Sequence, residues 1–153
     1  MKKYSIILTL AVLIMIAGSS FVLKSYETES NAITLTVPQD DDPAAAKFPN
    51  GLKIYKEKCI VCHQITGEGI PGAFPPLKNS DYLLADKKRA VKQVLNGSTE
   101  HLTINGTQYM APMPPQLDNH QDAVDVVNFV LNAWGNNGGT VKLEEVKDIK
   151  IVR

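Results

Sequence analysis

The sequence lacks an excess of charge of either sign. Its 153 residues include 16 lysines and arginines against 16 aspartates and glutamates. No run of like charge is longer than the three residues at 40–42 or at 87–89. A balanced chain of this kind does not have the basic footprint with which proteins bind nucleic acid, so we expect no nucleic-acid partner. The length suits one domain of ordinary size.

Cysteine and histidine are also scarce, with two cysteines and three histidines in the chain. Both cysteines and one histidine lie together in the stretch Cys59-Ile-Val-Cys62-His63. Two thiols separated by two residues can each bond to one vinyl group of a haem, and the next imidazole then lies beneath the iron. The motif therefore predicts one haem c, attached through Cys59 and Cys62 and ligated by His63.

Two other interpretations of the motif remain open. A structural zinc site needs four ligands, whereas outside the motif the chain has no second cysteine pair and only His101 and His120. A disulfide or a thiol oxidoreductase would suit an exported Cys-x-x-Cys pair, but that chemistry is typical of a βαβ context. The segment after His63 is rich in glycine and proline instead. Haem attachment is therefore the favoured interpretation.

A second stretch, from Tyr109 to Gln116, places two methionines among prolines. Proline fixes φ and cannot donate a backbone hydrogen bond, so this stretch should be neither a helix nor a central strand. A thioether on such a stiff loop suits the second axial position of a haem iron, where a methionine ligand raises the reduction potential. Met113 is preferred to Met110 because a Pro-Pro pair locks the backbone directly after it.

Residues 1–23 are predicted to be an export segment. Two lysines precede an apolar run that begins at Ile6, and small residues follow Ala17, as in a secretory signal peptide. If the run is extended to Leu23 it has 18 residues, which barely spans a bilayer as an N-terminal anchor. Either interpretation places the rest of the chain in the periplasm, free or tethered to the inner membrane.

The haem motif, the Met-Pro loop and a terminal helical pattern together resemble a class I c-type cytochrome with one haem, over roughly residues 48–134. The runs 72–77 and 126–136 are similar to haem domains that are attached to, or accompany, bacterial copper nitrite reductases. The resemblance implies an all-α fold, with three to four helices around the haem. We therefore expect a flexible linker at 24–47, a cytochrome c domain at 48–137 and a C-terminal arm at 138–153.

The sequence patterns support that fold. The last helix is expected to begin at Asp118, with Gln121 as its capping-box partner, and to be stopped by Gly135. In the resembled class the first and last helices cross, so Gly51 and Tyr55 should meet Phe129 or its neighbours. The remaining predicted elements are a first helix that begins near Asn50 as its N-cap and runs through Lys58, middle helices at 80–84 and 86–96, and a hairpin with an Asn-Gly turn at 102–109.

The resemblance also implies a role for Pro75-Pro-Leu77. In the family, a Pro-x-Leu element lies a dozen residues beyond the ligand histidine, and here Pro75 follows His63 by twelve residues. The Pro75 carbonyl is then expected to accept a hydrogen bond from His63 Nδ1, which fixes the tautomer and strengthens the ligand. Leu77 is expected to pack against the haem face.

With His63 and Met113 on its two sides, the iron would have no vacancy for a substrate. The resemblance therefore implies a monomeric one-electron carrier and not an enzyme. Its partners would be redox proteins of a respiratory chain, such as a copper nitrite reductase or a terminal oxidase. The alternative is a haem-based gas sensor or a haem enzyme, in which Met113 is labile, or the second position is open or taken by His101 or His120.

Replacement of the cysteines tests the covalent attachment. Cys59→Ala or Cys62→Ala should leave a single thioether bond or no mature haem protein, and the double variant should carry no covalent haem, because the chain has no other thiol. The measurement is the haem that stays with the chain on a denaturing gel. A normal yield of covalent haem in the double variant would contradict the assignment.

Overall fold

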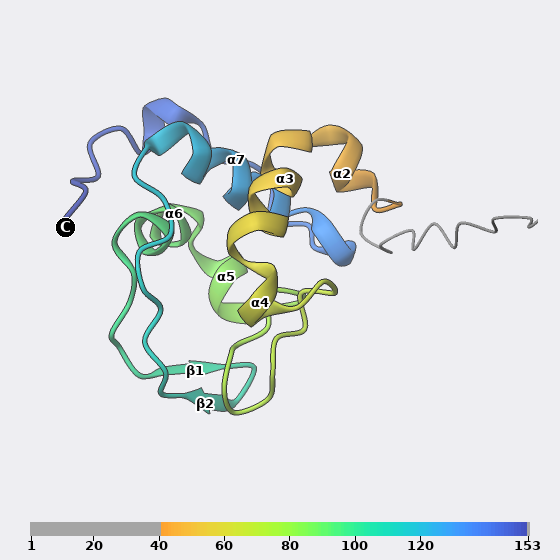
Figure 1. Ribbon diagram of the computed structural model, residues 1–153, viewed down its shortest axis with the longest axis vertical. Coiled ribbons are helices and arrows are strands. Elements are labelled where there is room, and N and C mark those ends of the chain that lie inside the picture. The colour runs from red at the N-terminus through yellow and green to blue at the C-terminus, as the bar shows by residue number, and fades with distance from the viewer. Residues whose placement is uncertain (1–40, 153) are drawn as a thin grey trace, which may run out of the picture. The chain divides into compact units, whose positions relative to one another are not determined.

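The computed structural model describes residues 41–152, so the predicted export segment and the linker up to residue 40 lie outside the described residues. The described part is mostly helical, which confirms the predicted fold class (Figure 1). Among residues 41–152 no helix has the length and apolarity needed to cross a membrane. The elements are α2 (Pro43–Lys47), α3 (Pro49–Lys58), α4 (Ile60–His63), α5 (Asp81–Ala85), α6 (Lys87–Asn96), β1 (Leu102–Ile104), β2 (Thr107–Tyr109), α7 (His120–Val130) and the 3₁₀ turns η1 (Ala133–Gly135) and η2 (Leu143–Glu145).

The tightest helix contact is the crossing of α3 and α7, which lie side by side in Figure 1. At the crossing point, a Cβ on Gly51 would lie 2.2 Å from the Asp125 carbonyl oxygen and 2.6 Å from Phe129 Cβ. A residue without a side chain is required there for the two backbones to approach so closely. Tyr55, one turn further along α3, is fully buried, and its ring centre lies 5.6 Å from that of Phe129. The predicted meeting of Gly51 and Tyr55 with Phe129 is confirmed.

Both predicted ends of the last helix were wrong. The N-cap is Asn119 and not Asp118, because the Asn119 side chain accepts the Asp122 backbone N–H at 2.8 Å. The predicted capping partner, Gln121, donates to the Asp125 carboxylate one turn along the helix instead. The helix ends at Val130, several residues before the predicted stop at Gly135.

The first helix begins slightly earlier than predicted. Pro49 occupies the first helical position, after Phe48, so Asn50 lies inside the first turn and is not the N-cap. Proline suits that position because its fixed φ is already helical and its missing N–H would have no partner there. The Asn50 side-chain amide lies 3.4 Å from the Asp125 carboxylate of α7.

The linker prediction was wrong for residues 43–47, which form α2. Asp42 caps this helix by accepting the Ala44 N–H at 2.8 Å, and Pro43 occupies its first position. Ala44 and Ala45 are both buried, and the helix packs on α3, α7 and η1. The short side chains of the two alanines let α2 lie directly against its neighbours. The polar residues that flank α2 in the sequence do not indicate this packing.

The C-terminal arm packs against the body. Val141 and Val146 are buried in the main hydrophobic core. The Asn128 side chain of α7 pairs with Val141, donating to its carbonyl at 3.0 Å and accepting its N–H at 2.8 Å. The Asn96 side chain, at the end of α6, holds the last described residues by bonds to Lys150 and Val152.

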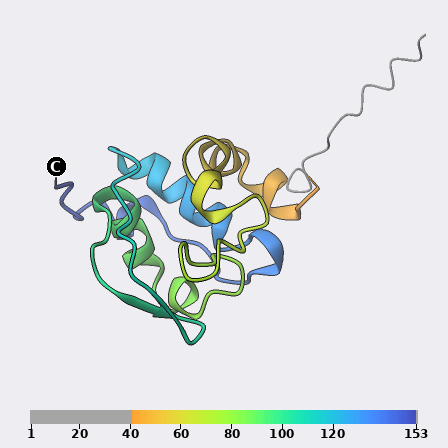
Figure 2. The same ribbon diagram turned by 60° about the horizontal axis from the view of Figure 1, so that its bottom comes forward.

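The predicted hairpin is present, with Leu102 paired to Tyr109 and Ile104 paired to Thr107. Its turn residues Asn105 and Gly106 have φ angles of 50° and 77°, as an Asn-Gly turn with two left-handed residues requires. In both Figure 1 and Figure 2 the hairpin lies on the side away from α7. It thereby extends the fold beyond the helical core.

Substitution of Gly51 tests the helix crossing. Gly51→Ala should lower the free energy of unfolding by about 3 kcal/mol, because the new methyl group would overlap backbone atoms of α7 that cannot yield without separating the helices. Lys53→Ala, in the same helix but exposed, is the control and should change it by no more than about 0.5 kcal/mol. Urea unfolding of the haem-loaded protein gives both values. Equal stability of the two variants would contradict the close crossing.

Candidate functional site

A mostly apolar cavity lies between the Cys-x-x-Cys-His segment and the Met-Pro loop. With its open mouth included, the space is about 1200 Å³. Its walls come from segments between Lys58 and Val130 that lie far apart in the sequence, so it forms only when these segments are folded together. The apolar residues that line it include Phe74, Pro75 and Leu77 after α4, Ala90 and Val94 of α6, Leu102, Ile104 and Tyr109 of the hairpin, and Val126, Val127 and Val130 of α7.

The two cysteines lie at one end of this cavity. Cys59 is the last residue before α4 and Cys62 lies within it, so a spacing of three residues puts both on one face of the short helix. Both thiols are free and line the cavity, whereas the side chain of Val61 between them is 78% exposed. Burial, and secondarily the charge of Cys62, raises the pKa of the Cys59 thiol to about 12.

His63 ends α4 and is held by the segment that follows. Its Nδ1 lies 2.9 Å from the Pro75 carbonyl oxygen, the contact that the resemblance predicted. Burial lowers the pKa of His63, while this hydrogen bond opposes the change. The imidazole is therefore neutral near pH 7, and since a carbonyl can only accept, its proton lies on Nδ1. Nε2 is left with its lone pair available to a metal.

A tight loop returns the chain from His63 to the Pro75 segment. The Gly67 carbonyl accepts backbone N–H groups from both Leu77 and Lys78, at 2.7 and 2.9 Å. These bonds set the position of Leu77, whose side chain lines the cavity. The Leu77 carbonyl in turn accepts the Asn136 side-chain amide at 3.0 Å, which links this segment to the chain beyond α7.

The two methionines of the second motif have different surroundings. Met113 lines the cavity, whereas Met110 is 55% exposed and is not part of the lining. The Met113 backbone pairs with Ser98 through two hydrogen bonds of 2.8 Å, so its loop is fixed to the chain after α6. Gly97 makes this approach possible, because its φ is 75° and a Cβ there would lie 2.4 Å from the Met113 carbonyl oxygen.

Gly97 directly follows the predicted helix 86–96, and nothing in the sequence indicated its contact with the methionine loop. The pattern Gly-Ser after a helix is too common to indicate a partner sixteen residues away. The pairing depends on how the hairpin returns the chain to the end of α6, which local sequence does not specify. Gly97 and Ser98 are therefore residues of the site that only the structure identifies.

The other two histidines are not placed at the cavity. His101 is exposed, and His120 Nε2 lies 2.8 Å from the Ile149 carbonyl oxygen of the C-terminal arm. Neither is among the residues that line the cavity. Within residues 41–152 there is also no group of three or more His, Cys, Asp or Glu side chains that could hold a metal ion. The zinc interpretation therefore finds no closed four-ligand arrangement among the described residues.

The residues at the cavity fit a haem. Two thiols separated by one helical turn suit two vinyl groups, and the imidazole next to them has its Nε2 lone pair available. A thioether from a different part of the chain lines the same cavity. Nitrogen and sulfur donors suit a transition metal and not Mg²⁺ or Ca²⁺, which prefer oxygen. The apolar walls match a flat organic group of large area.

The chain is similar in sequence to known proteins. A family model described as cytochrome c matches residues 48–134, more than half of the chain. Cytochrome c-552 of Thermus thermophilus is 36% identical over 93 residues, which cover 57% of this chain and 70% of that protein. Cytochrome c-555 of Methylococcus capsulatus is 29% identical over 114 residues, which cover 74% of this chain and 81% of that protein.

A further relative is larger. The cytochrome c subunit of a quinone alcohol dehydrogenase from Gluconobacter oxydans is 30% identical over 104 residues, which are 65% of this chain. The matched part is 22% of that subunit, so the chain spans about a fifth of its length. The similarity therefore concerns one haem-binding region and not the whole subunit.

Removal of the haem should unfold much of the domain. The cavity occupies the place where a domain of this size would have the centre of its hydrophobic core. Small domains often depend on a bound cofactor for stability, so we expect the haem to supply the missing part of the core. We expect the Cys59→Ala/Cys62→Ala chain to lose most of the helical signal in far-ultraviolet circular dichroism. The haem-loaded wild type is the control. A native spectrum from the haem-free chain would contradict this dependence.

Proposed function

The chain belongs to the cytochrome c family, as an electron carrier with one covalently bound haem c, and from this premise we propose that His63 and Met113 are its axial iron ligands. The observation that carries the proposal is that these two side chains line one cavity although fifty residues separate them. His63 reaches the cavity from α4, and Met113 reaches it from a loop fixed to the chain after α6.

When bound, the haem supplies a one-electron change between ferrous and ferric iron. The protein holds the group and controls its surroundings. Cys59 and Cys62 anchor it through two thioether bonds, and the Pro75 carbonyl orients His63 through Nδ1. Leu77 and the valines of α7 present apolar surface and exclude water. A dry and fixed environment keeps the reorganisation that accompanies electron transfer small.

The fixed position of Met113 supports a carrier over the alternative of a gas sensor or haem enzyme. In the alternative, the thioether must leave its position to admit a small ligand. The backbone of Met113 is held by both hydrogen bonds to Ser98 and lies against Gly97. Displacement of the loop would break this pairing, and we propose that it keeps the second axial position closed.

We propose that the protein works in the periplasm as a monomer, free or tethered through residues 1–23 to the inner membrane. This follows from the export pattern of those residues and from the external location at which c-type haem is attached in bacteria. The partners are redox proteins of a respiratory chain, met through a small and weakly bound surface. The equal numbers of acidic and basic residues argue against strong electrostatic steering.

Two observations bear on which partner this is. We propose a copper nitrite reductase as one candidate partner, on the resemblance of the runs 72–77 and 126–136 to haem domains that accompany such reductases. The similarity to a subunit of a quinone alcohol dehydrogenase supports a dehydrogenase as an electron source. The two are compatible, because a carrier needs both a donor and an acceptor. A terminal oxidase is the remaining candidate acceptor.

The visible spectrum tests the ligation. The oxidised wild type should show the weak far-red band of a sulfur-to-iron bond, and Met113→Ala should abolish it. Met110→Ala is the matched control, since that side chain is exposed and not part of the cavity lining, and it should leave the band unchanged. The reduction potential should fall in the Met113 variant alone, because the thioether favours the ferrous state.

Two results would contradict the proposal. Loss of the band in Met110→Ala, with its retention in Met113→Ala, would exchange the roles of the two methionines. A wild type that has no such band, and that binds carbon monoxide readily when reduced, would have an open iron site. The sensor or enzyme function would then be the better interpretation.

A further inference from the structure

Trp134 has a backbone conformation that its own chemistry disfavours. Its φ and ψ angles of 56° and 26° lie in the left-handed region, where a bulky side chain is a rare outlier. Such a conformation persists when surrounding contacts determine it, and these residues cluster at functional sites. The contact here is with Asp42, whose carboxylate accepts the Trp134 backbone N–H at 2.5 Å. Asp42 comes from the opposite end of the described chain, just before α2.

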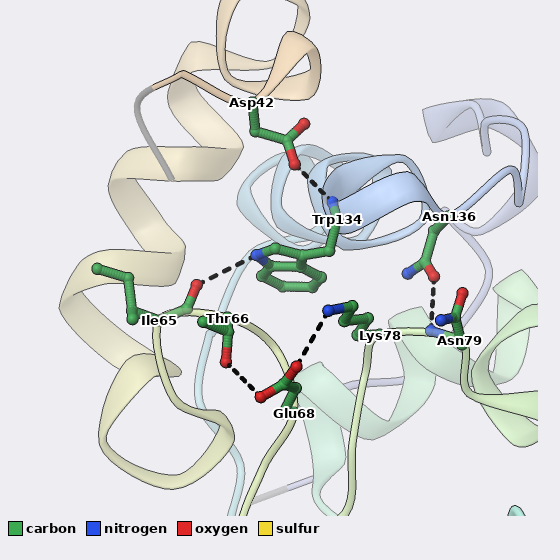
Figure 3. Close-up of polar contacts among 8 residues, drawn as sticks. All are labelled: Asp42, Ile65, Thr66, Glu68, Lys78, Asn79, Trp134 and Asn136. Carbon is green, nitrogen blue, oxygen red and sulfur yellow. Dashed lines mark hydrogen bonds and ion pairs between the residues drawn. The ribbon is translucent and has the colours of Figure 1, made fainter. Parts of the chain in front are cut away.

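The side chain of Trp134 extends from this anchor towards Ile65 (Figure 3). Its indole Nε1 donates to the Ile65 carbonyl, two residues after His63, at 3.1 Å. Its ring covers Gly67, where a Cβ would lie 2.5 Å from a ring carbon. The ring also packs edge-on against Tyr55, at 5.2 Å between centres. The Tyr55 hydroxyl donates to the Gln64 carbonyl at 2.6 Å, so two aromatic side chains hold the residues directly after His63.

Gly67, which the Trp134 ring covers, is also connected to His63 through the 75–78 segment. The Gly67 carbonyl accepts the N–H groups of Leu77 and Lys78, and the Pro75 carbonyl accepts the His63 Nδ1–H. A shift of Gly67 therefore moves both the chain that follows His63 and the segment that carries its hydrogen-bond acceptor.

We infer that Asp42 and Trp134 form a positioning latch for the haem ligand. The Asp42–Trp134 latch holds the 64–67 loop in place, and the loop holds the Pro75 carbonyl at hydrogen-bond distance from His63 Nδ1. The inference rests on the proposed ligation of iron by His63. Neither residue touches the cavity, so both act through His63 and are positioning residues. In their absence the Nδ1–H···O bond lengthens and opens more often.

Solvent exchange of the His63 Nδ1 proton measures this bond directly. In the reduced haem-loaded protein, followed by nuclear magnetic resonance, Trp134→Phe should accelerate the exchange by up to about tenfold, the factor that corresponds to the loss of one hydrogen bond that holds the 64–67 loop. Phenylalanine keeps an aromatic ring but cannot donate to Ile65. The reduction potential should rise in this variant, because a weaker hydrogen bond leaves the imidazole less electron-donating and the ferric state less stabilised.

Asp42→Asn is the milder variant, and it keeps the test informative should Trp134→Phe not mature. Asparagine still caps α2 through its one oxygen, but its amide nitrogen cannot also accept the Trp134 N–H. We expect exchange to accelerate and the potential to rise, both by less than in Trp134→Phe. The matched control is Asp86→Asn, where one carboxylate oxygen serves both N–H groups at the start of α6, so the change should have no effect on His63.

A second control separates positioning from stability. Asn119→Ala removes the N-cap of α7 and destabilises the domain without altering the latch. The inference is supported if the exchange of the His63 Nδ1 proton and the reduction potential change in both latch variants and stay the same in Asn119→Ala. Exchange and potential unchanged in both latch variants would overturn it and leave the proposed function intact. Absence of the far-red band from the oxidised wild type would instead overturn both the proposed ligation of the iron and the latch.

Discussion

The hydrogen bond between His63 Nδ1 and the Pro75 carbonyl is the constraint on which the arrangement of the site depends. A single bond of this kind contributes only about 1 kcal/mol to net stability, so its importance is positional. It keeps the proton on Nδ1, which leaves Nε2 available, and it fixes the 75–77 segment against the cavity. The bonds from Leu77 and Lys78 back to Gly67 then close the loop around it.

Features that depend on local chemistry could be predicted from the sequence. The Cys59–His63 stretch specifies one helical turn with two thiols on one face, and Asn105-Gly106 specifies a hairpin turn. The middle helices were predicted at 80–84 and 86–96 and lie at Asp81–Ala85 and Lys87–Asn96, with Ser80 and Asp86 as the N-caps that accept backbone N–H groups. In each case the residues that determine the structure are neighbours in sequence, so no knowledge of the tertiary fold was needed.

Features that depend on close approach could not be predicted in the same way. Residues 43–47 have the composition of a spacer, and α2 becomes recognisable only once the buried faces of Ala44 and Ala45 are seen. The apolar spacing of the last helix continues as far as Trp134, but the helix ends at Val130. The Asn136 side chain accounts for the difference, because its amide donates to the Val130 carbonyl at 2.7 Å and thus competes with continued helix. Tertiary partners overrode local periodicity at both places.

The two proposed axial ligands are held by independent parts of the fold, and this favours electron transfer over ligand exchange. His63 is held by the loop that Tyr55 and Trp134 cover, whereas Met113 is held by Ser98 at the end of α6. Movement of one ligand therefore need not be transmitted to the other. A sensor requires the opposite, namely a ligand whose release moves a connected element. Two separate anchors suit a carrier of single electrons, which requires a site whose shape changes little between ferrous and ferric iron.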